Sequence, residues 1–383
     1  MSEISGLFIR DQVEALASIE SDINVIVSLW GHADSALSFR QIKKWPKQLN
    51  WCITHPKDVI STKNGVHEIL NPKITWSDRF PMGGAGQLIK VNRRNFMLAQ
   101  EKFGKIDLIH AHVSYPAGFV AALLAKEFSI PYVITEHMGP FPFSNLVKND
   151  RPLDEITTAL TQSAANVAVS PSLAMRMTEF NYPFPRVIPN IVDERFFSFQ
   201  KSNSSKIVFF TLCKMIDLKG IDHLLESIAL WNPSPTSFEF RIGGAGPMLQ
   251  TYKQMANQLN ISDRVLWLGE LNREQVKNHF NECHIYVMPS RYETFGVVYA
   301  EAAASGKPII ATRCGGPEFI VNELNGLLVE VGDVSGLMNA MKEMVKNLKK
   351  YNPEEIRCDF EARFSRLAVV KQLRSLYDEV TGK

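Results

Sequence analysis

Short apolar, β-branched runs alternate with amphipathic segments along nearly the whole sequence. In the first half this pattern predicts strands at 23–29, 107–110, 132–136 and 166–170, and helices at 9–18, 117–128 and 153–163. In the second half it predicts strands at 207–212, 239–243, 265–268, 285–288 and 308–312, and helices at 222–231, 248–259, 273–281, 297–305 and 334–348. Such alternation is typical of βαβ units and a mostly parallel sheet. The sequence therefore predicts an α/β protein with two doubly wound halves.

The periodicity is lost in "VIPNIVDERFFSFQKSNSSK", which contains Pro189 and the polar run 201–206. We therefore expect a first domain over residues 1–190 and a second over 191–362. A chain of 383 residues is long enough for each domain to bury its own core. Residues 363–383 carry apolar side chains at helical spacing, so we expect a final helix that covers one of the two domains.

The amino terminus does not fit a doubly wound domain. Such a domain normally opens with a buried strand, whereas only five residues precede Gly6, which forms a loop-like pair with Ser5. Either the first strand is missing from this chain or the fold starts differently.

Composition narrows the class of protein. Hydrophobic residues make up 45% and charged residues 21%, as in soluble globular proteins. The net charge of +2 gives no argument for a nucleic-acid partner. The five cysteines are scattered singly, so neither a disulfide framework nor a thiolate zinc site is indicated. No signal peptide or apolar run of membrane-spanning length is present, so we expect a cytoplasmic protein.

The stretch "RQIKKWPKQLNW" mixes basic side chains with Trp45 and Trp51. The basic residues are Arg40, Lys43, Lys44 and Lys47. Such a mixture is compatible with peripheral contact to a membrane surface or a glycolipid. An exposed basic loop is the alternative.

Two lysines follow the first predicted strand of the second half, in "TLCKMIDLKGIDHLL". Lys214 and Lys219 stand where that strand ends, before a helix for which Asp222 is the expected cap. Ligands of open α/β sheets bind at the carboxyl ends of strands, and two ammonium groups there could neutralise a diphosphate. Two solvated surface lysines are the alternative.

The segment "RIGGAGPMLQ" is a strand, a glycine turn at 243–247 and a helix start. It is neither a dinucleotide fingerprint nor a P-loop, so close packing of the backbone is the favoured interpretation.

In "SRYETFGVVYAEAAASGKPIIATRCGGPEFI" a loop after a strand leads into a helix that starts near Gly296. The free amides of such a start, here in the backbone around Thr294 to Val297, can bind phosphate oxygens. Glu293 could accept hydrogen bonds from sugar hydroxyls, and Glu301 could hold a diol such as ribose. Alternatively, Glu293 only complements the helix dipole and Glu301 is solvated.

Three histidines stand near predicted strand ends. His110 and His112 alternate in "DLIHAHVSY", and His137 follows the strand in "YVITEHMGPF". Zinc is disfavoured because the spacing of a known zinc motif is absent. A histidine at the carboxyl end of a strand is well placed to meet a substrate hydroxyl.

Taken together, these motifs resemble the retaining GT-B glycosyltransferases of glycosyltransferase family 4. The resemblance covers "GLFIRDQVEALAS", "DLIHAHVSYPAGFVAALLAKEFSIPYVITEHMGPF", "VIPNIVD", "LCKMIDLKGIDHLLESIA" and "IGGAGPMLQTYKQMANQLNISDRVLWLGEL". It also covers an E-x7-E motif formed by Glu293 and Glu301.

The resemblance implies two Rossmann-like domains facing across a cleft, the first binding the acceptor and the second a nucleotide sugar such as a UDP- or GDP-sugar. Lys214 and Lys219 would bind the diphosphate, Glu301 the ribose and Glu293 the transferred sugar. The amides of residues 295–297 would face phosphate or sugar. His137 would lie near the anomeric carbon, and Gly6 would help to close the diphosphate pocket.

The implied reaction is front-face transfer with retention to a saccharide or lipid-linked acceptor, in the synthesis of a cell-surface or secreted polysaccharide or of a glycolipid. The resemblance implies no cofactor and no metal, in agreement with the lack of an Asp-x-Asp motif. The sequence departs from the family pattern at Lys214, where an arginine is usual, and at the missing first strand.

Rival interpretations use the same fold. A nucleotide-sugar epimerase or a glycoside phosphorylase would have the same architecture but would not transfer the sugar to a new acceptor. A catalytically idle subunit that binds a nucleotide sugar is a rival of another class.

Overall fold

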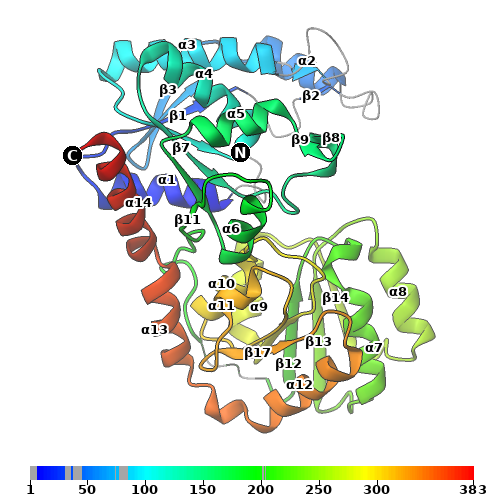
Figure 1. Ribbon diagram of the computed structural model, residues 1–383. Helices are drawn as coiled ribbons and strands as arrows, with labels where there is room; N and C mark the ends of the chain where they lie inside the picture. The colour runs from blue at the N-terminus through cyan, green and yellow to red at the C-terminus, as the bar shows by residue number, and fades with distance from the viewer. Residues whose placement is uncertain are drawn as a thin grey trace. The chain divides into compact units, whose positions relative to one another are not determined.

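The computed structural model describes residues 7–30, 36–37, 45–73, 75–76, 85–200, 202 and 204–383. The chain forms two compact units (Figure 1). Unit 1 comprises residues 1–169, 174–188 and 370–383, and unit 2 comprises residues 170–173 and 189–369.

Unit 1 contains two principal sheets. Its longer strands are β1 Val25–Leu29, β3 Val59–Lys63, β4 Val66–Leu70, β6 Ile109–His112, β7 Tyr132–Glu136, β10 Ala165–Ala168 and β11 Arg186–Val187. One sheet has the order β1-β4-β3, and the other has the order β11-β10-β7-β6. All neighbouring pairs in these two sheets are parallel except β3 with β4.

Helices pack around these sheets. They are α1 Leu7–Ile19, α2 Trp45–Thr54, α3 Ala85–Phe103, α4 Phe119–Phe128, α5 Asp154–Gln162 and α6 Pro171–Thr178. The short strands are β2 Ala36–Leu37, β5 Thr75–Trp76, β8 Val147–Lys148 and β9 Arg151–Pro152. Buried Asn95 fastens α3 to the first sheet, because its amide donates to Ser28 Oγ at 2.9 Å and to the Leu29 carbonyl at 3.1 Å.

Unit 2 is built on one parallel sheet with the order β14-β13-β12-β15-β16-β17. Its strands are β12 Ile207–Leu212, β13 Phe238–Gly243, β14 Val265–Gly269, β15 Ile285–Met288, β16 Ile309–Thr312 and β17 Gly326–Val329. Its helices are α7 Ile221–Trp231, α8 Leu249–Gln258, α9 Arg273–Glu282, α10 Val297–Ala304, α11 Pro317–Ile320, α12 Val334–Lys346 and α13 Pro353–Phe364. The strand order reverses between β12 and β15, as in a doubly wound sheet.

Burial explains why these apolar runs form strands. Every residue of β15 and β16 is buried, as are the central residues of β12, because helices cover both faces of a parallel sheet. Phe209 of β12 stacks on Phe240 of β13, with ring centroids 4.8 Å apart.

The last helix, α14 Arg366–Thr381, passes from unit 2 into unit 1. Figure 1 shows it in red beside α1 in blue. Arg374 pairs with Asp22 at 2.7 Å and with Glu20 at 3.1 Å, directly after α1. The carboxyl-terminal part of this helix therefore covers unit 1, a choice that the sequence left open.

Candidate functional site

The residues expected to bind a nucleotide sugar meet where the strand order of unit 2 reverses. The loop after β12 carries Lys214 and the turn Asp217–Lys219, and the loop after β15 carries Ser290 and Glu293. Because β12 and β15 are neighbours, these loops share one edge of the sheet. Ligands of open α/β sheets bind at such a position.

Lys219 and Glu293 form the central contact of this site. The Lys219 ammonium donates to Glu293 Oε1 at 2.6 Å, and the Ser290 hydroxyl donates to the same oxygen at 2.9 Å. Glu293 is only 8% exposed. A paired, hydrogen-bonded carboxylate can remain charged when buried. Glu293 is therefore a buried member of an ion pair, and the alternative that it only complements the helix dipole stays a prediction.

The backbone around Glu293 is fixed by the loop that follows β16. The Glu293 N–H donates to the Cys314 carbonyl at 3.3 Å, and the Gly316 N–H donates to the Glu293 carbonyl at 2.8 Å. A Cβ atom on Gly316 would lie 2.4 Å from the Phe295 carbonyl oxygen, so only glycine allows this approach. Burial raises the pKa of Cys314 to about 12, so this thiol stays neutral beside the ion pair.

Arg291 holds the turn that carries Lys219. Its backbone N–H donates to the Leu218 carbonyl at 2.8 Å, and its guanidinium donates to the Asp217 carbonyl at 2.5 Å. The same guanidinium donates to Asp222 Oδ1 at 2.9 Å. Burial would raise the pKa of Asp222, but the bonds from Arg291 outweigh it and lower that pKa below its usual value. Sequence reasoning missed Arg291 because no local pattern links it to a turn 72 to 74 positions away.

The expected helix cap at Asp222 is wrong. Gly220 is the N-cap of α7 with φ 64°, and Asp222 lies in the first turn, where it binds Arg291. A Cβ atom on Gly220 would lie 2.0 Å from the Pro289 carbonyl oxygen, so the two loops touch through their backbones. Glycine is used here for its left-handed conformation and its small size.

The glycine turn after β13 supports the loop of Lys214. A Cβ atom on Gly244 would lie 1.8 Å from the Cys213 carbonyl oxygen, and the Met215 N–H donates to the Ala245 carbonyl at 2.9 Å. The interpretation of this turn as close backbone packing is confirmed. The Lys214 side chain is exposed, as the alternative of a solvated surface lysine predicts.

Helix α10 begins beside Glu293 with its first amides uncapped by a side chain. Gly296 is its N-cap with φ 87°, and a glycine has no side chain that could accept a hydrogen bond from the first turn. Phe295 is 2% exposed and packs against Phe364, with centroids 5.8 Å apart. Glu301 lies within α10 and is half-buried. The free amides at the start of a helix can bind an anion.

His137 lies in unit 1, directly after β7. His112 Nδ1 is 2.9 Å from His137 Nε2, and the ring of Phe8 lies with its centroid 4.8 Å from that of His137. Desolvation by the surrounding protein lowers the pKa of His112 to about 4. His112 is therefore a neutral hydrogen-bond partner of His137 at pH 7.

Buried Glu136 shapes the loop of His137. One carboxylate oxygen accepts the N–H groups of His137 at 2.8 Å and Met138 at 2.9 Å, and the other accepts that of Ser114 at 2.9 Å. Burial raises the pKa of Glu136, while these bonds oppose the rise. No sequence pattern predicted this role, because Glu136 looks like any other residue of the strand 132–136.

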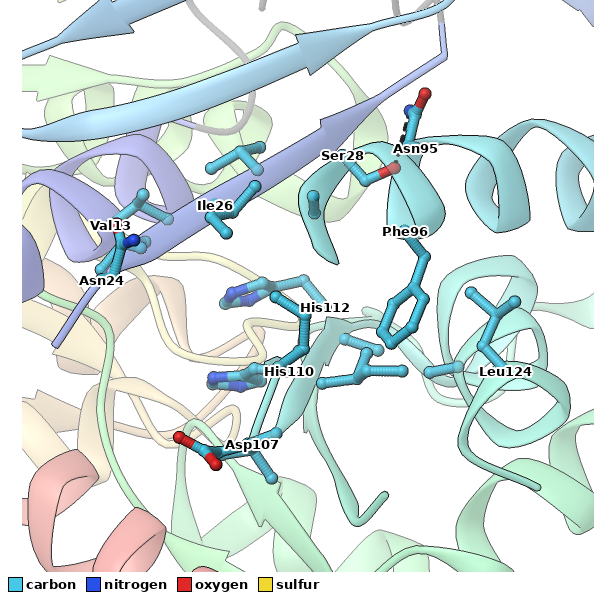
Figure 2. Close-up of a pocket in the computed structure, with 18 of the residues that line it drawn as sticks. Val13, Asn24, Ile26, Ser28, Asn95, Phe96, Asp107, His110, His112 and Leu124 are labelled. Atoms are coloured by element: carbon cyan, nitrogen blue, oxygen red, sulfur yellow. Dashed lines mark hydrogen bonds between the residues drawn. The ribbon is translucent and has the colours of Figure 1, made fainter. Parts of the chain in front are cut away.

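His110 makes hydrogen-bond contacts with both of its ring nitrogens. Figure 2 shows it beside His112, where both line a pocket of unit 1. Its Nδ1 lies 2.6 Å from the Tyr377 hydroxyl and its Nε2 lies 2.7 Å from Thr135 Oγ1, so it links β6 to α14. Both ring nitrogens of His110 are thus engaged within unit 1. Within the residues that the structure describes, no group of three or more His, Cys, Asp or Glu side chains is placed to hold a metal ion.

Two further expectations fall partly or wholly outside the described residues. Gly6 lies outside them, as do Arg40, Lys43 and Lys44. Trp45 and Trp51 lie on α2, where Leu49 and Ile53 are exposed. No helix in the described ranges has the length and apolar character needed to cross a membrane.

Comparisons with known proteins agree with the architecture. The model of glycosyl transferases group 1 matches residues 192–354, and the model of glycosyltransferase family 4 matches residues 58–196. Together the two matches extend over residues 58–354 without a gap.

The chain is also similar to individual proteins. It is 29% identical to an uncharacterized glycosyltransferase of Methanocaldococcus jannaschii, over 75% of this chain and 81% of that protein. It is 28% identical to N-acetyl-alpha-D-glucosaminyl L-malate synthase of Bacillus anthracis, over 72% of this chain and 75% of that protein. Anabaena HepE, solved with UDP, shares the fold with a TM-score of 0.70 at 18% identity, over 98% of this chain and 96% of that one.

Two Rossmann-like units define the GT-B fold of glycosyltransferases, which this chain shares with HepE. Within that class, the chain belongs to the family 4 and group 1 glycosyltransferases.

Proposed function

We propose that this chain is a retaining glycosyltransferase that moves a sugar from a nucleotide-diphosphate donor to a hydroxyl group. The observation that carries the proposal is the ion pair of Lys219 and Glu293, in which Nζ lies 2.6 Å from Oε1. This pair lies beside the start of α10, where the N-cap residue is a glycine. A cation and helix amides at one strand edge suit a diphosphate whose charge grows as the sugar departs. HepE, which shares the fold, has been solved with UDP and with UDP-glucose, which supports a nucleotide-sugar donor here.

Each residue then has a proposed role. Lys219 and exposed Lys214 bind the diphosphate and stabilise the departing nucleotide. The amides of Phe295, Gly296 and Val297 bind phosphate or sugar oxygens. Glu301 holds the ribose. Glu293 accepts hydrogen bonds from the transferred sugar through Oε2, because both of its described contacts fall on Oε1.

His137 and Gly6 complete the proposal on the side of unit 1. The neutral His112 neighbour leaves His137 able to exchange a hydrogen bond with a sugar hydroxyl. Gly6 is proposed to approach the diphosphate through its backbone. No metal takes part in this proposal, because Lys219 and the helix amides supply the charge that the diphosphate requires.

The acceptor is proposed to be a saccharide or a lipid-linked saccharide in the synthesis of a polysaccharide or glycolipid. Peripheral contact of α2 with the inner face of the cytoplasmic membrane would bring a lipid-linked acceptor to the enzyme.

A thermal-shift titration with UDP-, GDP- and ADP-sugars tests the donor. The matching nucleotide sugar stabilises the chain in a concentration-dependent way, by about 2.7 kcal/mol at a hundred times its Kd. Proton NMR of the glycoside formed with a supplied acceptor then reports the anomeric configuration. An inverted product, or a rearranged donor without any glycoside, contradicts the proposal.

A further inference from the structure

Arg363, next to the last residue of α13, binds the end of α11. Its guanidinium donates to the Ile320 carbonyl at 3.2 Å and to the Phe319 carbonyl. It also pairs with Asp359, one turn earlier in α13, at 2.9 Å. Helix α11 is only four residues long, so the carbonyls at its end have no partners within the helix. Arg363 therefore supplies hydrogen bonds that this short helix cannot supply itself.

Helix α11 in turn holds the backbone of Glu293. The Phe319 N–H donates to the Gly316 carbonyl at 3.0 Å, and the Gly316 N–H donates to the Glu293 carbonyl at 2.8 Å. A Cβ atom on Gly315 would lie 2.9 Å from the same Glu293 oxygen, so this segment packs directly on the loop after β15. A continuous series of hydrogen bonds thus leads from Arg363 through α11 to Glu293.

Aromatic rings pack beside this series of bonds. The guanidinium of Arg363 lies over the Phe364 ring, with its central carbon 4.5 Å from the ring centroid. The fully buried Phe364 ring makes edge contacts with Phe319 at 5.7 Å and with Phe295 at 5.8 Å between centroids. Because close-packed side chains have little room to rearrange, these rings keep α13, α11 and Phe295 together.

Arg363 does not reach the candidate site directly. Within the described part of unit 2, the hydrogen bonds of its side chain are all with α11 and α13. The turn of Lys219 is held separately, by Arg291. Loss of the Arg363 bonds would therefore loosen the loop of Glu293 and leave the turn of Lys219 in place.

We propose that Arg363 is a positioning residue that fixes the Glu293 carboxylate through α11 and residues 315–316. The inference rests on the proposed function, in which Glu293 binds the transferred sugar and Lys219 binds the diphosphate. It assigns Arg363 to the sugar side of the donor. Without the Arg363 bonds, affinity for the whole nucleotide sugar falls, whereas affinity for the nucleoside diphosphate is kept.

The test variant is Arg363→Met. Methionine keeps an unbranched side chain that packs well on an aromatic ring such as that of Phe364, but it donates no hydrogen bond. Arg264→Met is the matched control, because Arg264 donates to the Pro233 carbonyl at 2.7 Å and to the Asn260 carbonyl at 3.0 Å. Arg264 directly precedes β14, so it lies at the end of the parallel sheet opposite to the candidate site.

Two measurements on the full chain test the proposal. Amide hydrogen exchange without ligand is expected to quicken at Gly316 in Arg363→Met and to stay unchanged in Arg264→Met. Isothermal titration uses the UDP-, GDP- or ADP-sugar that stabilises the wild type most, and the corresponding nucleoside diphosphate. Arg363→Met is expected to weaken binding of the nucleotide sugar about tenfold and that of the nucleoside diphosphate less than about twofold. Arg264→Met is expected to bind both like the wild type.

A kinetic cycle with Glu293→Ala shows whether Arg363 acts through Glu293. Alone, Arg363→Met is expected to lower kcat/KM about tenfold. Added to Glu293→Ala, it is expected to lower kcat/KM no further, although Tm still falls, because the two residues act as one unit. Effects that multiply, unchanged exchange at Gly316, or equal losses of affinity for the nucleotide sugar and the nucleoside diphosphate would each overturn the proposal.

The kinetic results also separate this inference from the proposed function. Wild-type activity of Glu293→Ala contradicts both, whereas a loss in Glu293→Ala with wild-type kinetics in Arg363→Met overturns the inference alone. If Arg363→Met does not fold, Arg363→Lys takes its place, because lysine keeps the charge but lacks the fork that binds two carbonyls. Faster exchange at Gly316 in that variant supports the inference, and unchanged exchange overturns it.

Discussion

The Lys219 ammonium lies 2.6 Å from Glu293 Oε1, although 74 positions separate the two residues. The contact exists because β12 and β15 are neighbours in the sheet and their following loops meet at the same edge. It joins the expected phosphate-binding residue to the expected sugar-binding residue. A ligand bound by both would therefore be held at its diphosphate and its sugar.

Replacing either partner of this pair is expected to lower turnover. Lys219→Ala removes the proposed phosphate cation and Glu293→Ala removes the sugar acceptor, so each should reduce kcat/KM at least about tenfold, or about 1.4 kcal/mol. The double variant should lose less than the product of the two effects, since contacting residues are not additive. Steady-state kinetics with the donor found by thermal shift provides the measurement. Lys342→Ala, an exposed change in α12, is the control, and wild-type rates in both site variants contradict the assignment.

Arg291 is expected to act as a positioning residue. Arg291→Lys keeps a positive charge but loses the fork that binds the Asp217 carbonyl and Asp222 together, so the turn of Lys219 loosens. We expect kcat/KM to fall about tenfold, or about 1.4 kcal/mol, with a lower Tm. Asp222→Asn is also expected to lower Tm. If Arg291→Lys changes Tm alone and leaves kinetics intact, the positioning role is wrong.

The strands of unit 2 show how far the sequence determines this fold. The runs at 207–212 and 285–288 are buried on both faces, so their apolar pattern predicted β12 and β15 to the residue. β6 begins and ends two residues later than expected, at Ile109–His112, because its last two residues still pair with β7. Helix α3 and strands β3 and β4 were missed, since polar residues interrupt their apolar patterns.

The candidate site was predictable only in part. Lys219 and Glu293 follow strands in recognisable motifs, and their sequence contexts suggested a common edge of a sheet. Arg291 and Glu136 act through hydrogen bonds to segments distant in the sequence, and no local pattern encodes such contacts. Ser290 binds Glu293 within one irregular loop, whose geometry no periodic pattern predicts. Asp222 was misassigned because a cap residue and an ion-pair residue look alike in sequence.

Gly244 is expected to tolerate no side chain. Gly244→Ala would place a Cβ atom 1.8 Å from the Cys213 carbonyl oxygen at φ 119°, so the loop of Lys214 must move. We expect a loss of about 2 kcal/mol or more in unfolding free energy, measured by urea denaturation. Gly86→Ala in α3 is the matched control, because no neighbouring atom lies within 4 Å of its Cβ position. Equal stability of the two variants would show that the contact is not made in solution.

Stability should fall as the pH drops from about 6.5 to about 4, because His112 is held neutral. Its folded pKa of about 4 lies below the ordinary value of 6.5, so the unfolded chain binds more protons in this interval. Glu136 opposes this trend, since its raised pKa destabilises the folded state as the pH rises. The difference between wild type and His112→Asn separates the two effects. The variant should show a smaller fall in Tm over this interval, and an identical pH profile would count against a neutral His112.

Helix α2 should contribute to any contact with a membrane. Ile53 is 79% exposed there, so Ile53→Asp is expected to reduce co-sedimentation with vesicles containing anionic lipid several-fold. Met175→Asp, at a 60% exposed residue of α6, is the control for added charge on an exposed apolar side chain. Equal losses for both variants, or none for either, speak against a contact through α2.

The last segment of unit 1, residues 370–383, follows residues 189–369 of unit 2 along the chain. In topological terms, unit 2 is an insertion within unit 1. Cutting the gene after residue 188 would remove Arg374 and Tyr377, which bind the Asp22 and His110 side chains of unit 1. During synthesis, unit 1 cannot complete its contacts until residues 370–383 leave the ribosome, whereas all residues of unit 2 leave it earlier.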